Sequence, residues 1–207
     1  MINMKPTVLL TQNRKLKKTS DLIGFKVLNF GITAFKTSTG KVTCPMASGC
    51  EKYCYAQKGA FWWKKVKDAY ERRYVATQEP NFVDKVNAEI LKKKPKYVRV
   101  HDSGDYYSKK YLDKWLAIAI HNPDVRFYSY TLMVDMFKKT KLPANFDVIF
   151  STAGKQDHLI NKKVDRHSEI FIDAEKLRSK GYSTAAVNDL HATKWFTENN
   201  KIGLIYH

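Results

Sequence analysis

The sequence predicts an α/β protein built on a mainly parallel sheet, and two observations lead to this prediction. Segments with strand composition alternate with amphipathic helical segments along most of the chain. Such alternation is typical of βαβ units, whose strands lie parallel. The chain accommodates about six or seven such units, too few for a full eight-fold barrel of ~250 residues. We therefore expect a partial (β/α)6-type barrel, and the alternative is an open doubly wound sheet.

The first 24 residues are predicted to form a basic N-terminal arm, followed by one α/β domain at residues 25–207. The segment 1–50 contains a single acid, Asp21, and residues 14–18 form a basic run. A run of this kind either contacts a phosphate backbone or is a solvated terminus.

The other elements follow from composition and periodicity. Apolar side chains recur every four residues over 61–79, which predicts a helix, and Pro80 favours the start of a second helix that ends near residue 94. Ser108 has the chemistry of an N-cap for a helix that ends near residue 121. Short helices are expected at 134–139, 156–161, 175–179 and 191–198. Strands are expected at 26–35 (a strand or hairpin), 96–101, 126–131, 146–151, 169–173, 185–187 and 202–206.

The composition is strongly basic, with 37 Lys and Arg against 20 Asp and Glu and a formal net charge of +17. A protein this basic usually binds a polyanion, so we expect DNA or RNA as a partner of the basic surface. A lysine-rich solvated surface explains the same composition equally well, and base-specific reading favours arginine.

No segment has the features of a signal peptide or a membrane span. The triplet Val8-Leu9-Leu10 is too short for a signal-peptide core, and no apolar run approaches ~18–20 residues. We therefore expect no membrane contact and a cytoplasmic location, where thiols stay reduced. For a phage-encoded chain this is the host cytoplasm. The sequence predicts no particular oligomeric state.

All three cysteines, Cys44, Cys50 and Cys54, lie in one loop at residues 43–56. Three thiols cannot all pair as disulfides, and a cluster of this kind typically holds a metal or an iron–sulfur cluster. Three ligands leave one position open, which suits catalysis. The loop follows the first strand, so we expect it at the carboxyl end of the sheet. A [4Fe–4S] cluster is favoured, and the alternative is zinc with His101 as a further ligand.

A second motif, His101-Asp102-Ser103-Gly104-Asp105, comes directly after a strand and before a helix. Gly104 permits close backbone approach, either carboxylate can bind a ligand ammonium group, and Ser103 can bind a carboxylate. Alternatively, Asp102 and Asp105 hold Mg²⁺ in a nuclease, or the motif is an ordinary polar turn.

Two later serines end strands of the same predicted sheet. Ser129 lies near the end of the strand at 126–131, and Ser151 ends the strand at 146–151. Small hydroxylated residues here suit a cofactor pocket, and they suit ordinary turns equally well.

The two motifs in this order resemble the phage gene product 88 family, and the resemblance covers residues 25–205. The cysteine loop is also similar to that of radical S-adenosylmethionine enzymes, which carry three cysteines after the first barrel strand and an aromatic residue before the third, as Tyr53 precedes Cys54. Here five and three residues separate the cysteines, rather than three and two. Ser-Gly-Asp stands where those enzymes have Gly-Gly-Glu.

The second similarity implies a cluster and a cofactor. The three cysteines would ligate a [4Fe–4S] cluster, and S-adenosylmethionine would bind its open iron. Ser103, Gly104 and Asp105 stand in the place of the motif that binds the cofactor's amino group. Further cofactor contacts are expected from Tyr53, His101, Ser129 and Ser151.

Three functions are consistent with these residues. The favoured one is an enzyme that cleaves S-adenosylmethionine reductively to a 5′-deoxyadenosyl radical, which acts on an anionic substrate such as a nucleic acid or nucleotide. The first alternative is a nucleic-acid-binding module with a structural iron–sulfur or zinc site. The second alternative is a Mg²⁺-dependent nuclease with a structural cluster.

Overall fold

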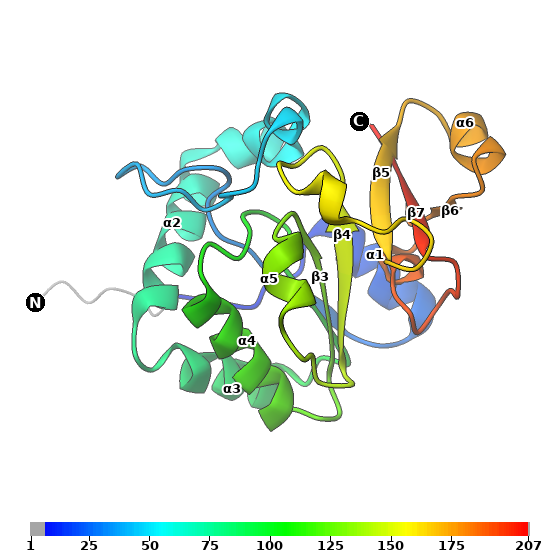
Figure 1. Ribbon diagram of the computed structural model, residues 1–207. Helices are drawn as coiled ribbons and strands as arrows, with labels where there is room; N and C mark the ends of the chain where they lie inside the picture. The colour runs from blue at the N-terminus through cyan, green and yellow to red at the C-terminus, as the bar shows by residue number, and fades with distance from the viewer. Residues whose placement is uncertain (1–6, 207) are drawn as a thin grey trace, which may run out of the picture.

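A curled, all-parallel sheet forms the centre of the molecule in the computed structural model, which describes residues 7–206 (Figure 1). Its strands are β1 (Val27–Phe30), β2 (Tyr97–Val100), β3 (Arg126–Thr131), β4 (Phe146–Ser151), β5 (His167–Phe171), β6 (Ser183–Thr184) and β7 (Lys201–Ile205). The order is β1-β2-β3-β4-β5-β7-β6, and each neighbouring pair is parallel. The first five strands therefore follow chain order, as in a barrel, whereas a doubly wound sheet reverses direction. The predicted partial barrel is confirmed.

Helices cover both faces of this half-barrel. They are α1 (Arg14–Ile23), α2 (Lys64–Gln78), α3 (Phe82–Lys93), α4 (Lys109–His121), α5 (Val134–Lys138) and α6 (Ala174–Ser179). Short 3-10 turns occur at Gly49–Tyr53, Tyr55–Gln57, Gly59–Trp62, Asp157–Leu159 and Asp189–Ala192. Figure 1 shows α2 to α5 on one side of the sheet and α1 on the other. No helix within residues 7–206 is long and apolar enough to cross a membrane.

Two apolar cores result from the strand alternation. Val98 and Phe127 face the larger core under α2 to α5, whereas Tyr97 and Tyr128 face a smaller core. Successive side chains of a strand point to opposite faces, so each strand serves both cores. The smaller core is closed by Leu16 of α1 and by residues 185–192. The inner face of the half-barrel is therefore filled by protein.

Helix α1 occupies residues 14–23 of the segment 1–24 that is predicted to be a basic arm. Asn13 caps its first turn by accepting from Leu16 N, and Gly24 ends it with a φ of 72°. Leu16 and Thr19 are buried against β1. An amphipathic spacing within the basic run explains the packing. The structure thus differs from a free arm at residues 7–24, and residues 1–6 lie outside the described part.

The structure changes several local predictions. The segment 26–35, expected as a strand or hairpin, contains a single strand, β1, because residues 31–35 leave the sheet. The helix expected at 156–161 is the 3-10 turn Asp157–Leu159. The helix expected at 191–198 is a short 3-10 turn, Asp189–Ala192, followed by irregular structure. The strand expected at 185–187 is β6, two residues earlier.

Candidate functional site

The cysteine loop lies at the carboxyl edge of the half-barrel and is hydrogen-bonded to two neighbouring loops. Asp105 N donates to Thr43 O at 3.0 Å, which joins it to the loop after β2. Cys50 N donates to Ala153 O at 3.1 Å, which joins it to the loop after β4. In parallel α/β folds ligands bind at this edge, so the cysteines are where a site is expected.

The three thiols are free and half-buried. Burial, together with the neighbouring Asp105 and Cys54, raises the pKa of Cys44 to about 12. Burial and the neighbouring Cys54 also raise the pKa of Cys50. The thiols are therefore protonated at neutral pH, and a metal would have to displace those protons on binding.

Three cysteine thiols are chemically suited to ligate a metal or an iron–sulfur cluster, but in this structure they are not arranged around one point. Within residues 7–206, no group of three or more His, Cys, Asp or Glu side chains lies close enough to hold a metal ion. The turns at Tyr55–Gln57 and Gly59–Trp62 bury no residue. Segments with few buried contacts reorganise at low cost. A cluster held by all three thiols would therefore require this loop to rearrange until they converge. The side chain of Tyr53 is outside the described part of the structure.

His101 packs as a core residue. Its φ of 63° turns the ring out of the strand alternation, and the ring lies 4.4 Å from the ring of Tyr106. Its Nε2 lies 2.9 Å from the hydroxyl of Tyr111. Burial lowers its pKa to about 3, so the imidazole is neutral. Its Nδ1 is buried without a hydrogen-bond partner among the described residues, and the roles of zinc ligand or cofactor contact stay predictions.

Gly104 and Asp105 hold the loop after β2 in place. Gly104 has a φ of 78°, and a Cβ there would overlap Ile32 Cγ1. The Asp105 carboxylate accepts from Thr131 Oγ1 at 2.6 Å and from Leu132 N at 2.9 Å. Its oxygens thus tie this loop to the end of β3. Burial raises the pKa of Asp105 to about 6.

We expect Asp105→Asn to flatten the pH dependence of stability in weakly acidic solution. Because the folded-state pKa of about 6 lies above the ordinary value of 3.8, the folded protein holds this proton more tightly than the unfolded chain. The group's contribution to the free energy of unfolding is therefore fully present below pH 3.8 and is lost as the pH rises through 6, by about 3 kcal/mol.

Urea unfolding of both proteins at several pH values across this window measures the effect. Asp113→Asn, which removes a carboxylate 54% exposed, is the control for the change in charge. An Asp105→Asn protein that keeps the wild-type slope would contradict the assignment.

The serines of the predicted site have different surroundings. Ser129 is buried, and its Oγ donates to Val100 O at 2.8 Å, so it joins β3 to β2. Ser151 is half-buried at the carboxyl end of β4. Ser103 is buried, and its Oγ has no hydrogen-bond partner among the described residues. Of the three, Ser103 has a polar atom left for a ligand.

The structure adds a buried charge cluster that the sequence reasoning missed. Asp189, with no exposed side-chain surface, pairs with Lys15 at 2.6 Å and with Arg99 at 3.2 Å. It also accepts from the hydroxyl of Tyr128 at 2.6 Å. The two cations lower the pKa of Asp189 to about 2. A charged residue within the apolar strand Tyr97–Val100 was the available signal, because buried charges require partners.

The hydrogen-bond network of Asp102 is the second feature that the sequence did not indicate, because its partners come from four segments. Its Oδ2 accepts from Asn29 at 2.5 Å, from Tyr70 at 3.0 Å and from Asn13 at 3.3 Å. Its backbone carbonyl accepts from the hydroxyl of Tyr55, a cysteine-loop residue. Oδ1 is buried without a partner among the described residues.

Unpartnered buried polar atoms recur around Asp102. They include His101 Nδ1, Asp102 Oδ1, Ser103 Oγ, Thr43 Oγ1, Arg99 Nε and Tyr130 OH, each without a hydrogen-bond partner within residues 7–206. Folded proteins rarely leave such atoms unpaired, and a group of them indicates a place for a ligand or for water. All belong to β2, β3 or the loops at the carboxyl edge. The candidate site therefore extends from the cysteines to Arg99.

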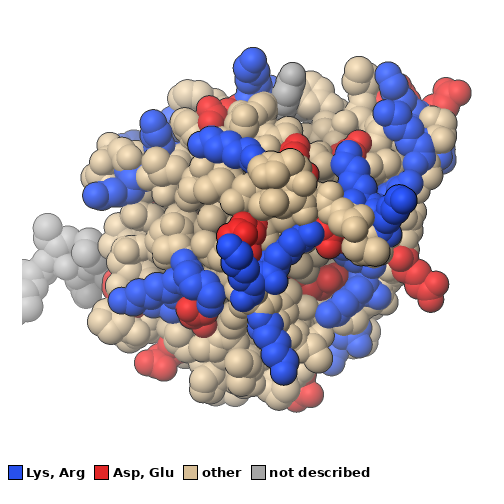
Figure 2. Space-filling model, in the orientation of Figure 1, with Lys and Arg blue, Asp and Glu red and all other residues tan. Residues whose placement is uncertain are grey.

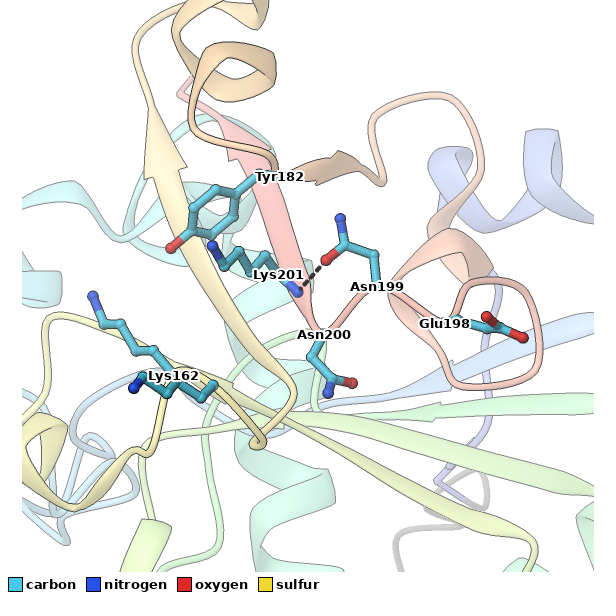
Figure 3. Close-up of a pocket in the computed structure, with 7 residues that line it drawn as sticks. Lys162, Tyr182, Glu198, Asn199, Asn200 and Lys201 are labelled. Carbon is cyan, nitrogen blue, oxygen red and sulfur yellow. Dashed lines mark hydrogen bonds between the residues drawn. The ribbon is translucent and has the colours of Figure 1, made fainter.

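The positive charge is not confined to this site. Figure 2 shows Lys and Arg spread over the visible face with Asp and Glu among them. An open pocket of ≈ 510 Å³ is lined by Lys162, Lys163, Tyr182, Glu198, Asn199, Asn200 and Lys201 (Figure 3). Lys201 is the first residue of β7, so this pocket lies at the amino edge of the sheet. It is separate from the cysteine loop.

Comparison with known proteins identifies the family. The family model described as gene product 88 matches residues 7–207. The chain belongs to the gene product 88 family. The match includes α1, so the helix in place of the predicted arm is part of the family's matched region. No solved structure matches the chain.

Two phage relatives of this gene product 88 chain are known by name. It is 33% identical to the Gene 88 protein of Mycobacterium phage L5 over 101 residues, which cover 43% of this chain and 42% of that protein. It is 30% identical to the Gene 88 protein of Mycobacterium phage D29 over 101 residues, with the same coverage. Each match spans less than half of the relative. Both relatives support the prediction of a phage protein.

Proposed function

We propose that this protein binds a [4Fe–4S] cluster through Cys44, Cys50 and Cys54 and acts on an anionic substrate beside it. The observation that carries the proposal is the position of three free thiols on one loop at the carboxyl edge, next to unpartnered buried polar atoms. Thiolate-ligated clusters with three cysteines leave one iron open for a ligand. Such a cluster, when bound, supplies an electron to S-adenosylmethionine.

The protein's own residues would bind and orient the ligands. Asp102 offers Oδ1 and Ser103 offers Oγ toward a polar cofactor, because neither atom has a partner among the described residues. Arg99 lies deeper, with an unpartnered Nε, and is suited to an anionic group. Asp105 supports the loop rather than contacting a cofactor, since both its oxygens accept hydrogen bonds within the protein.

Tyr55 separates this interior from solvent. The residue is 53% exposed, whereas its hydroxyl donates inward to Asp102 O. Burial of that hydroxyl raises its pKa to about 12, so it stays a donor. Because Tyr55 follows Cys54 directly, an ordering of the cysteine loop around a cluster would also move this cover.

Anaerobic reconstitution with iron and sulfide tests the proposal. We expect absorbance near ~400 nm from thiolate-bound iron and sulfide in the wild-type protein and its loss in Cys50→Ser and Cys54→Ser. Addition of S-adenosylmethionine and a reductant is expected to release 5′-deoxyadenosine. Ser48→Ala, in the same loop, controls for loop damage. Stoichiometric zinc without a cluster would refute the proposal.

The contacts of the two acids do not favour the nuclease alternative. The Asp102 carboxylate accepts hydrogen bonds from residues of β1, α2 and the start of α1, whereas the Asp105 carboxylate accepts one from β3. A Mg²⁺ site needs carboxylate oxygens that converge on one point. Nucleic acid is retained as the class of polyanion that the charge of +17 favours as substrate or partner.

A further inference from the structure

Two adjacent tryptophans stand exposed beside the cysteine loop. Trp62 is 62% exposed and Trp63 is 68% exposed. Large aromatic side chains are usually buried, so two neighbours in solvent indicate a binding surface. Trp62 ends the 3-10 turn Gly59–Trp62, and Trp63 is the residue before α2. Both therefore lie at the junction between this turn and α2.

The segment that carries the two tryptophans is cationic. Residues 52–67 contain five lysines and no acid. All five, Lys52, Lys58, Lys64, Lys65 and Lys67, are exposed. Lys67 Nζ lies 3.7 Å from the centre of the Trp62 ring, and Lys64 pairs with Asp68 at 2.8 Å. Lys52 and Lys65 have no acidic partner among the described residues. Two aromatic faces within a cationic segment are complementary to stacked bases and phosphates.

This surface is connected to the candidate site by aromatic contacts. The ring of Phe61 lies 5.8 Å from that of Tyr55 and 5.3 Å from that of Tyr70. Tyr55 and Tyr70 both donate to Asp102. Because Trp62 follows Phe61, a chain bound over the tryptophans would pass next to the cysteine loop.

We propose that Trp62, Trp63 and the lysines of residues 52–67 form a docking surface for single-stranded nucleic acid. The inference rests on the proposed function, which has a polyanion as substrate or partner. It adds that this polyanion is a single strand of nucleic acid and says which protein surface binds it. Bases of a single strand are free to stack on exposed rings, whereas the bases of a duplex are already stacked on each other. Lysine, a point charge, suits sequence-independent contacts to phosphates.

Fluorescence anisotropy with labelled dT12 and rU12 tests the surface. We expect Trp63→Ala to raise the Kd for the preferred strand at least about five-fold, the lower end for loss of one stacked base. Phe25→Ala, which removes an aromatic ring 55% exposed at the amino end of β1, is the matched control and is expected to leave Kd unchanged. Equal Kd values for Trp63→Ala and wild type would overturn the proposal.

The lysines are tested by the salt dependence of binding. Lys65→Ala is expected to reduce the slope of log Kd against log salt by about 0.7, the value for one phosphate contact on a single strand. Lys92→Ala, an exposed lysine of α3, makes the same charge change away from the surface and is expected to keep the slope. A matching loss in both variants would overturn the assignment to residues 52–67.

Further measurements distinguish single-stranded nucleic acid from other binding partners of this surface. Tighter binding of a 12-bp duplex than of dT12 or rU12 would overturn the single-strand assignment. A change in sedimentation of Trp62→Ala without a change in Kd would identify a contact between copies instead. Strand binding by protein that takes up no cluster would uphold this inference while the proposed enzyme fails, so the two failures are distinguishable.

Discussion

Asp189→Ala is expected to lower the free energy of unfolding by about 3–5 kcal/mol, the cost of removing one partner from a buried ion pair. The change leaves Arg99 buried without its acid, since the Arg99 side chain is only 12% exposed. It also removes the partner of Lys15 and thereby loosens α1. Urea unfolding followed by far-UV circular dichroism measures the loss.

An exposed pair provides the matched control for this prediction. Asp113→Ala breaks the exposed pair with Lys109 on α4 and is expected to cost at most about 0.5 kcal/mol. If Asp189→Ala fails to fold, Asp189→Asn retains an acceptor for Tyr128 and is expected to lose less. Equal costs for Asp189→Ala and Asp113→Ala would contradict the buried-pair account.

The pH dependence has a definite sign for the same residue. The folded-state pKa of Asp189 is lowered to about 2, below the ordinary value of 3.8. Its contribution to stability is therefore present above pH 3.8 and is lost as the pH falls through 2. The Asp189→Asn protein is expected to lose less stability than wild type over this acid range.

Gly104→Ala is expected to destabilise the protein by about 2–4 kcal/mol through backbone strain and overlap. The φ of 78° disfavours any residue with a Cβ, and that Cβ would overlap Ile32 Cγ1 and lie 3.1 Å from Ile32 O. Displacement of Ile32 would disturb its hydrogen bond to Ser103 O and so the loop after β2. The midpoint of urea unfolding measures the effect.

Comparison with Gly40→Ala separates the steric part of that cost from the backbone part. Gly40 has a φ of 80°, nearly that of Gly104, but a Cβ there meets nothing within 4 Å. Only the backbone term applies, so about 1 kcal/mol is expected. A Gly104→Ala protein as stable as Gly40→Ala would show that Ile32 moves aside freely.

Local features of the fold were predictable because they depend on neighbouring residues. The strands β3 and β4 have the predicted bounds, and Ser108 caps α4 as expected, with its Oγ accepting from Tyr111 N. Alternation of strands and helices predicted the parallel sheet, and the strand order in the structure decided for the half-barrel. Errors fell on segments such as 191–198, where packing rather than periodicity decides the backbone.

The site was less predictable because its contacts join distant segments. Arg99 and Asp189 are 90 residues apart, and no local pattern indicates that they pair. Asp105 carries a carboxylate suited to binding a ligand, yet its oxygens accept hydrogen bonds from Thr131 and Leu132 at the end of β3. Asp102, from the same motif, keeps one oxygen unpartnered among the described residues.

The sequence by itself determined the fold class, the family resemblance and the carboxyl-edge position of the three cysteines. These features depend on the alternation of strands and helices and on the spacing of residues close together in the chain. Only the tertiary structure decided that α1 fills the inner face, that His101 turns into the core, and that Tyr55 and Tyr70 meet at Asp102. These arrangements depend on which buried polar groups find partners, and that is settled when distant segments pack together.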